Sequence, residues 1–321
     1  MKILVTGGLG FVGINIVKSL AASGIGEIVV GDVLDYDAAM QDFLSKYQDR
    51  ILVTYLDIRN REAVLDLFSS EKITQVVSAA AITPNLEQEN QQPEFVVDVN
   101  LNGTVNILNA CLKNDVDQML YCSSSGVYPP ISSAKNQIQK EAGPLELDNL
   151  YAVTKYSSEL LTQQFAKISG SGRRMASVRI SSIYGPMEQP KISRQHTSQM
   201  FKLKEAWQKK KQLKLYGPHV KREWTYAADV GAAIQALFRA ENWNYEVYNI
   251  GFGKAYSFSE VIALYESQGL KVEWVGQAED ADISMTAERA RSAMSVEQLI
   301  KDTGFQPEIS LEEGIRLYLD I

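Results

Sequence analysis

The chain has 321 residues, of which 45% are hydrophobic and 22% charged, as in an ordinary globular protein with one large α/β domain or a large domain and a smaller lobe. Its net charge of −7 argues against nucleic acid as the main partner, because phosphate backbones are bound by basic surfaces. Neither a long apolar run nor a signal-peptide pattern occurs, so we expect no membrane span and a cytoplasmic protein with reduced, buried cysteines at Cys111 and Cys122.

Short apolar runs alternate with amphipathic stretches along the first half of the chain. The runs predict buried strands, and the stretches, whose apolar residues recur at helical spacing, predict helices. This alternation predicts an α/β fold with a doubly wound parallel sheet of the Rossmann type. In chain order we expect strands at 3–5, 28–30, 51–56, 76–77, 119–122 and 176–180, and helices at 12–20, 63–68, 95–112 and 151–168.

The pattern changes after about residue 184, where a Gly-Pro break precedes a lysine-rich helical stretch at 202–211. Short strands expected at 213–216, 247–250 and 272–275 then predict a smaller C-terminal substrate-binding lobe. We expect residues 1–184 to form the nucleotide-binding domain and 185–321 mainly the lobe, with at least one later segment crossing back. The lysines form either a solvated helix face or a rim that attracts a phosphorylated substrate.

A glycine-rich turn, TGGLGFVG at residues 6–13, joins the first predicted strand to the first helix. Glycines there allow a tight turn and close approach to a pyrophosphate, and the helix N-terminus offers free N–H groups to phosphate oxygens. The predicted cofactor contacts in this turn are Gly7, Gly10, Phe11 and Val12.

Acidic and small residues follow the next three predicted strands. Asp32, after the second strand, would accept hydrogen bonds from the adenosine ribose and repel a 2′-phosphate, so we predict NAD rather than NADP. The alternative is an aspartate that only caps a helix or turn. Asp57 and Ile58 end the third strand, where they would grip adenine. Ala79, Ala80 and Ala81 end the fourth, where small side chains let a cofactor lie against the backbone.

Tyr151 and Lys155 lie one turn apart on a predicted helix. A lysine ammonium beside a tyrosine favours the phenolate, which can take a proton from a hydroxyl while hydride leaves the same carbon. Two neighbouring surface residues would show the same spacing. Three serines, Ser123 to Ser125, end the fifth strand at the carboxyl edge where open α/β sheets bind ligands, and a hydroxyl there would hydrogen-bond the reacting oxygen. The alternative is a polar turn.

Together these motifs resemble the extended short-chain dehydrogenase/reductase family, in its branch of NAD-dependent sugar epimerases and dehydratases. The resemblance covers nearly the whole chain and also includes Asn100 with Gly103-Thr104, the YGP triplet at 184–186 and the stretch from Arg222 to Val230.

The resemblance implies specific roles. Tyr151 would be the acid/base, Lys155 would tune it and hold the nicotinamide ribose, and Ser124 would hydrogen-bond the reacting hydroxyl. Asn100 would help to order the active site at the cofactor. The resemblance also implies a homodimer through the helices at 95–112 and 151–168.

Two departures from the family pattern bear on which of the family's reactions and substrates we expect. Family 4,6-dehydratases carry Thr-Asp-Glu where this chain has Ser124-Ser125-Gly126, so the acid and base needed to eliminate water are missing and we do not expect a dehydratase. Nucleotide-sugar epimerases carry Asn where this chain has Ser182. Arg222 does match the family's phosphate-contacting arginine, and the alternative is a surface salt bridge with Glu223.

Three functional hypotheses follow, with Ser125, Ser182 and Arg222 as the predicted substrate contacts. The first is an NAD-dependent sugar epimerase, acting on a nucleotide sugar through a transient ketone. The second is an NAD-dependent dehydrogenase of a free sugar, sugar acid or polyol, which the loss of the asparagine favours. The third is a non-catalytic NAD-binding protein, since a fold alone does not establish chemistry. Arg291 is a further candidate cation, and we assign no metal ligands.

Overall fold

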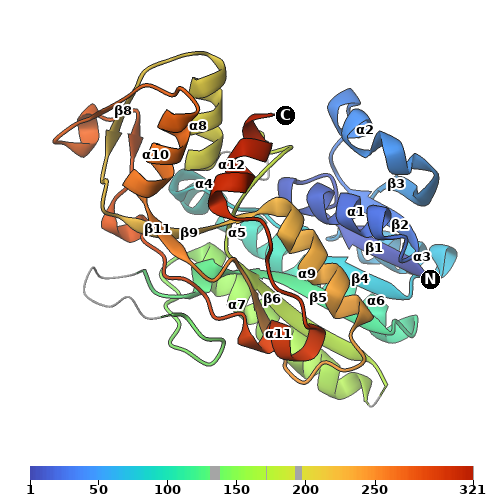
Figure 1. Ribbon diagram of the computed structural model, residues 1–321. Coiled ribbons are helices and arrows are strands. Elements are labelled where there is room, and N and C mark those ends of the chain that lie inside the picture. Colours follow the sequence, from blue (N-terminus) through green and yellow to red (C-terminus); the bar gives the residue numbers. More distant parts are fainter. Residues whose placement is uncertain (131–137, 171, 192–196, 321) are drawn as a thin grey trace.

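Seven parallel strands form the central sheet of the computed structural model, which describes residues 1–130, 138–170, 172–191 and 197–320 (Figure 1). The strand order is β10-β6-β5-β4-β1-β2-β3. This arrangement confirms the predicted doubly wound α/β fold. The strands are β1 (Lys2–Thr6), β2 (Glu27–Asp32), β3 (Ile51–Tyr55), β4 (Gln75–Ser78), β5 (Gln118–Ser124), β6 (Arg174–Ile180) and β10 (Val247–Ile250).

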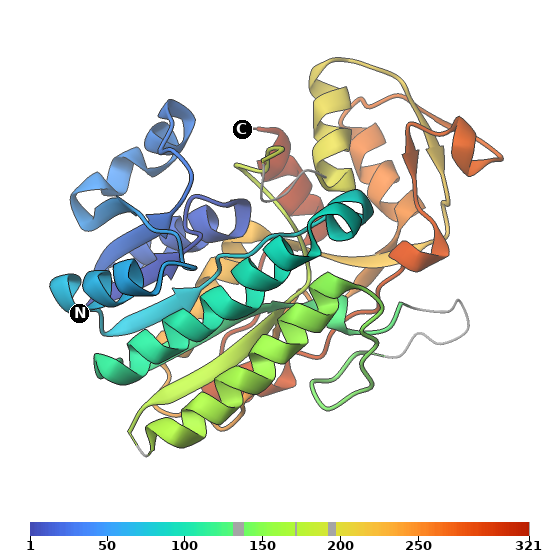
Figure 2. The same ribbon diagram turned by 180° about the vertical axis from the view of Figure 1, so that it is seen from behind.

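Helices cover both faces of this sheet, because its strands are apolar on both sides. In β1, Ile3 and Val5 pack into the core beneath α1 (Phe11–Ser23) and α9 (Ala227–Arg239), which contact each other. Leu4, between them, points into the opposite core, beneath α3 (Arg61–Glu71) and α6 (Gly103–Lys113). Figure 2 shows α6 and the long α7 (Leu150–Ser169) lying side by side on that second face. Near the first face lie α2 (Ala38–Leu44), after β2, and α11 (Glu297–Thr303), against α9.

The helix expected at 95–112 is present but not regular. It comprises α5 (Pro93–Val97), a π-helical turn (Asp98–Asn102) and α6. Such turns widen a helix by one residue and are frequent at functional sites. Here the turn contains the buried Asn100.

A second, smaller core lies beyond the carboxyl ends of the main strands, around buried Trp224 and Tyr265. Two three-stranded sheets, in the orders β11-β9-β7 and β12-β8-β13, frame it (Figure 1). Its elements are β7 (Ser182–Tyr184), α8 (Gln199–Gln208), β8 (Leu213–Tyr216), β9 (Lys221–Tyr226), β11 (Ala255–Ser257), α10 (Phe258–Ser267), β12 (Val272–Trp274), β13 (Ile283–Ser284) and α12 (Leu311–Leu319).

Two expectations about the C-terminal part need correction. The strand at 247–250 belongs to the main sheet, where β10 pairs in parallel with β6, and not to the lobe. The lysine-rich helix ends at Gln208, so the lysines at 209–211 follow it, and Lys204 packs its ammonium 4.4 Å from the centre of the Tyr318 ring. Within the described residues, no helix is both long and apolar enough to cross a membrane.

Candidate active site

A cavity of about 590 Å³ opens at the carboxyl ends of the main strands and extends toward the lobe. Ligands of open α/β sheets bind at this edge. Sixteen of the predicted site residues line the cavity: Gly7, Gly10, Phe11, Val12, Asp32, Asp57, Ile58, Ala79, Ala80, Ala81, Ser124, Ser125, Tyr151, Lys155, Ser182 and Arg222. Asn100 lies behind the wall, 1% exposed.

The glycine-rich turn brings the backbone of two strands unusually close together. Gly7 has a φ of +64°, and a Cβ built on it would lie 2.5 Å from the Cα of Ala80 at the end of β4. A Cβ on Gly13 would lie 2.1 Å from the Gly7 carbonyl oxygen. Gly10 then caps α1 with no side chain in the way, so the first N–H groups of the helix face the cavity edge. This cradle fits a pyrophosphate.

Asp32 is buried at the end of β2 and is already held from two sides. Its Oδ2 accepts the Leu9 N–H at 2.8 Å, and its Oδ1 accepts the Leu34 N–H at 3.0 Å. A carboxylate has about four acceptor positions, so two remain for ribose hydroxyls. Asp57 accepts from the Arg59 side chain, and this hydrogen bond holds the pKa of Asp57 below its usual range. The cradle, the two carboxylates and the alanines thus fit a dinucleotide with an unphosphorylated ribose.

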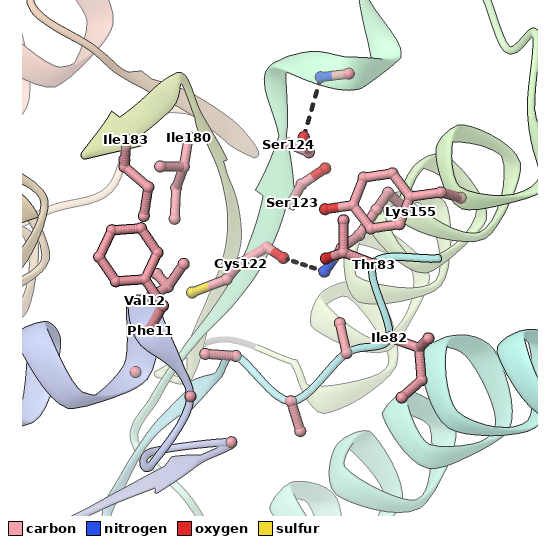
Figure 3. Close-up of a pocket in the computed structure, with 18 of the residues that line it drawn as sticks. Phe11, Val12, Ile82, Thr83, Cys122, Ser123, Ser124, Lys155, Ile180 and Ile183 are labelled. Carbon is pink, nitrogen blue, oxygen red and sulfur yellow. Dashed lines mark hydrogen bonds between the residues drawn. The ribbon is translucent and has the colours of Figure 1, made fainter. Parts of the chain in front are cut away.

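The predicted catalytic side chains come from β5 and the first turns of α7. Figure 3 shows Ser123, Ser124 and Lys155 on one side of the cavity and Phe11, Val12, Ile180 and Ile183 on the other. Asn149 caps α7 by accepting the Ala152 N–H at 2.8 Å, so the helix begins at Leu150 and Tyr151 lies in its first turn. The result is a slot with an apolar wall facing a polar one.

Lys155 is 3% exposed, and its Nζ donates to the Cys122 carbonyl oxygen at 2.8 Å. The same Nζ lies 5.7 Å from the centre of the Tyr151 ring. Burial alone disfavours the ammonium, but attraction to Tyr121, Tyr151 and Cys122 outweighs it, and the pKa of Lys155 is raised. Lys155 therefore stays charged at neutral pH and favours negative charge on its neighbours.

Gly126 leaves open the space between Ser124 and Tyr151, the other two predicted catalytic residues. A Cβ built on it would lie 3.2 Å from the Ser124 Oγ and 3.7 Å from Tyr151 Cε1. The Gly126 N–H donates to Ser124 Oγ at 3.0 Å, which leaves the serine proton free to point elsewhere. This glycine stands where the family's dehydratases carry a glutamate, so the described site has no acid at this position.

Asn100 shapes the cavity through the backbone after β4. Its Oδ1 accepts the Ile82 N–H at 2.7 Å, and its Nδ2 donates to the Ile82 carbonyl oxygen at 3.0 Å and to Thr154 Oγ1 at 3.2 Å. The amide therefore ties the loop that bears Thr83 to α7. These hydrogen bonds are compatible with the predicted ordering role, which stays a prediction, as does the predicted cofactor contact of Asn100.

The far wall of the cavity carries three arginines, Arg222, Arg289 and Arg291. Arg222 Nε donates to Ser182 Oγ at 2.6 Å, and its Nη1 donates to the Arg289 carbonyl oxygen at 3.2 Å. The carboxylate of Glu223 is turned away to the Gly253 and Met294 N–H groups. Ser182 thus contacts the arginine that was expected to contact the substrate. Three arginines that line one wall suit a diphosphate.

Several residues of the cavity wall were not predicted from the sequence. Arg291 was named only as a candidate cation and not as a substrate contact. Arg289 escaped notice because the chain around it has no motif and reaches the cavity through pairing with a distant strand. A carboxylate on α4 (Leu86–Gln91), Glu89, was also missed; its Oε1 accepts the Tyr151 N–H at 3.1 Å. Other missed lining residues include Thr83, Phe95, Val99, Asn149, Ile180, Ser181, Ile183, Thr197, Gln199 and Trp224.

A buried ion pair lies directly behind the catalytic strand. Glu159, one turn after Lys155 on α7, accepts a hydrogen bond from Ser123 and pairs with Arg179 of β6 at 2.7 Å. Arg179 also donates to the Tyr128 hydroxyl at 2.9 Å. These contacts link β5, β6 and α7 where they carry Ser124, Tyr151 and Lys155.

Residues 3–251 match the model of the NAD-dependent epimerase/dehydratase family. This chain belongs to that family, whose cofactor is NAD, and the predicted resemblance is confirmed. It is 31% identical over 328 residues to the low-salt glycan biosynthesis protein Agl12 of Haloferax volcanii, covering 100% of this chain and 98% of the relative.

Two solved structures show how broadly this fold is used. The UDP-glucose 4-epimerase of Thermus thermophilus in complex with NAD is 26% identical, with a TM-score of 0.78 over 100% of this chain and 98% of the other. The dTDP-glucose 4,6-dehydratase of Bacillus anthracis, also in complex with NAD, is 22% identical, with a TM-score of 0.81 over 100% and 96%. The shared fold therefore does not separate epimerase from dehydratase.

Proposed function

We propose that this chain is an NAD-dependent epimerase of a nucleotide sugar. The observation that carries the proposal is that one cavity joins the dinucleotide cradle, the Ser124/Tyr151/Lys155 group and the three-arginine wall. A free sugar or polyol has no anionic group for that wall, and a sugar acid has a single carboxylate, whereas the diphosphate of a nucleotide sugar offers two charged groups to the three arginines. The similarity to a UDP-glucose 4-epimerase supports the same assignment.

In the proposed cycle Tyr151 acts twice, first as a proton acceptor and then as a proton donor. Tyr151, beside the Lys155 ammonium, takes the proton of one sugar hydroxyl while Ser124 hydrogen-bonds the same oxygen. NAD, which the cradle around Gly7 and Asp32 would hold, would supply the hydride acceptor for that carbon and the hydride donor for its return. Tyr151 then gives its proton back to the oxygen, and the arginines hold the diphosphate while the sugar turns. Gly126 offers no acid for eliminating water, which is why we do not propose a dehydratase.

One observation favours the dehydrogenase as a second candidate. Ser182 stands where the family's nucleotide-sugar epimerases carry asparagine, and its hydroxyl accepts from Arg222. The cofactor content of freshly purified protein separates the two. Near-stoichiometric NAD that exchanges slowly against labelled NAD supports the epimerase, whose cycle never releases it. Empty protein that binds NAD reversibly and forms NADH from a sugar or sugar acid supports the dehydrogenase.

We also propose a homodimer through α6 and α7. Val153, Leu160 and Ile168 lie along one side of α7 and are 40%, 43% and 68% exposed. Apolar residues gathered on one helix face are typical of a protein–protein contact. Light scattering of the wild type and of Leu160→Glu tests this: we expect a dimer that becomes a monomer, and a monomeric wild type would contradict it.

A further inference from the structure

The arginine wall is built from two segments that are far apart in the sequence. Arg222 belongs to β9, and the other two arginines belong to the segment 289–294. The Arg291 N–H donates to the Lys221 carbonyl oxygen at 3.0 Å, and Arg222 Nη1 donates to the Arg289 carbonyl oxygen at 3.2 Å. The position of Arg289 and Arg291 therefore depends on how segment 289–294 is fastened to β9.

The side chain of Glu223 makes the third fastening. Side chains alternate along a strand, so Arg222 faces the cavity and Glu223 faces the other way. Glu223 is 1% exposed. Its Oε1 accepts the Gly253 N–H at 2.6 Å, and its Oε2 accepts the Met294 N–H at 3.0 Å. One carboxylate thus joins β9, the loop after β10 and the segment that bears two of the arginines.

The surroundings are shaped to this carboxylate. A Cβ on Gly251 would lie 2.5 Å from Glu223 Oε1, so only glycine fits at this position of the neighbouring loop. Burial raises the pKa of Glu223 to about 7, although the N–H groups of Gly253, Met294 and Phe252 oppose that shift. Burying a carboxylate lowers the free energy of unfolding, because the charge loses its hydration, whereas an apolar side chain of the same size carries no such penalty. The contacts that it makes explain why the cost is tolerated.

We propose that Glu223 is a positioning residue that holds segment 289–294 so that Arg289 and Arg291 face the cavity and bind the anionic part of the substrate. The inference rests on the proposed function in one respect, namely that this part is a nucleoside diphosphate. Glu223 touches neither the cofactor cradle nor Tyr151, so it acts on substrate affinity and not on the chemical step.

The test compares Glu223→Gln with wild type and with Lys221→Ala, a control on the same strand that removes an exposed side chain and keeps the Lys221 carbonyl oxygen that accepts the Arg291 N–H. Glutamine keeps one oxygen acceptor, but its NH₂ group then faces the N–H of either Gly253 or Met294, which loses its hydrogen bond. We expect faster hydrogen–deuterium exchange in residues 289–295 and roughly ten-fold weaker binding of UDP to the NAD-loaded protein, because one of the two N–H groups loses its acceptor and the segment that bears Arg289 and Arg291 is held less firmly. We expect kcat and NAD affinity to stay within about two-fold of wild type, and the control to behave as wild type.

Unchanged exchange in 289–295 together with unchanged UDP affinity would overturn the proposal. If wild type does not bind UDP, the nucleotide-sugar assignment fails, while the exchange measurement still decides whether Glu223 fastens the segment. If Glu223→Gln does not fold, Glu223→Asp serves instead, because it keeps the charge but is one methylene too short to reach both N–H groups. The same two outcomes then apply.

Discussion

The Nζ of Lys155 donates to the carbonyl oxygen of Cys122 at 2.8 Å and so ties the catalytic helix α7 to the end of β5. This bond fixes the ammonium beside the Tyr151 ring, with Ser124 two residues along the strand. We expect Lys155→Met to lower kcat roughly 100-fold, within the range of contributions from acid–base groups. A Lys155→Met protein with the kcat of wild type would contradict this role.

Replacement of Tyr151 separates catalysis from binding. Tyr151→Phe removes the proton acceptor but keeps the ring, so we expect activity to fall by roughly 10²–10⁴-fold while NAD remains bound. Tyr156→Phe, on the same helix but outside the cavity lining, is the matched control and should keep its activity. A fully active Tyr151→Phe protein would exclude the proposed chemistry. Loss of activity in both variants would indicate damage to the helix.

Gly7 tests the cofactor cradle. In Gly7→Ala the new methyl would meet the backbone of Ala80 at 2.5 Å, in addition to the strain of a positive φ. We expect a folded protein that is purified without NAD. Gly170→Ala controls for the strain alone, because Gly170 has a φ of +75° and its Cβ would meet nothing within 4 Å. Equal NAD content in the two variants would show that the close approach to Ala80 does not matter.

The Glu159–Arg179 pair should matter for stability more than for chemistry. Both side chains are at most 3% exposed, so Glu159→Gln leaves Arg179 as a buried charge without a full partner. We expect the free energy of unfolding to fall by roughly 3–5 kcal/mol in denaturant titrations. The double variant Glu159→Leu/Arg179→Met removes both charges and should recover much of that loss. No recovery would show that the hydrogen bonds to Ser123 and Tyr128 dominate.

Glu223 should make stability depend on pH in a defined direction. Its pKa is raised by burial from 4.5 to about 7, so the fold binds this proton more tightly than the unfolded chain does. The resulting stabilisation is fully present below pH 4.5 and is lost as pH rises toward 7, about 3 kcal/mol in all. The unfolding free energy of wild type minus that of Glu223→Met should therefore fall across this window. A difference that stays flat with pH would contradict the raised pKa.

The sequence predicts best what is local. The turn around Gly7 and the helical spacing of Tyr151 and Lys155 are written in contiguous residues, and the alternation of elements predicted the sheet. The segment that brings Arg289 to the cavity reaches β9 through long-range pairing, which leaves no local pattern. For the same reason the apolar run of β10 fits either sheet until its partner, β6, is known. The partners of Glu223 are equally distant, so its proximity to Arg222 suggested a salt bridge that the carboxylate does not make.

The central claim is tested most directly by incubating the purified protein with UDP- and dTDP-hexoses, without added NAD, and following the sugars by proton NMR. The account predicts that one nucleotide sugar converts to an equilibrium mixture with its epimer, with no accumulation of NADH and no 4-keto-6-deoxy product. No conversion without NAD, but NADH formed in stoichiometric amount from a sugar once NAD is added, would instead show a dehydrogenase. A keto-deoxy product would show that water is eliminated despite Gly126, and either result would contradict the proposed epimerase.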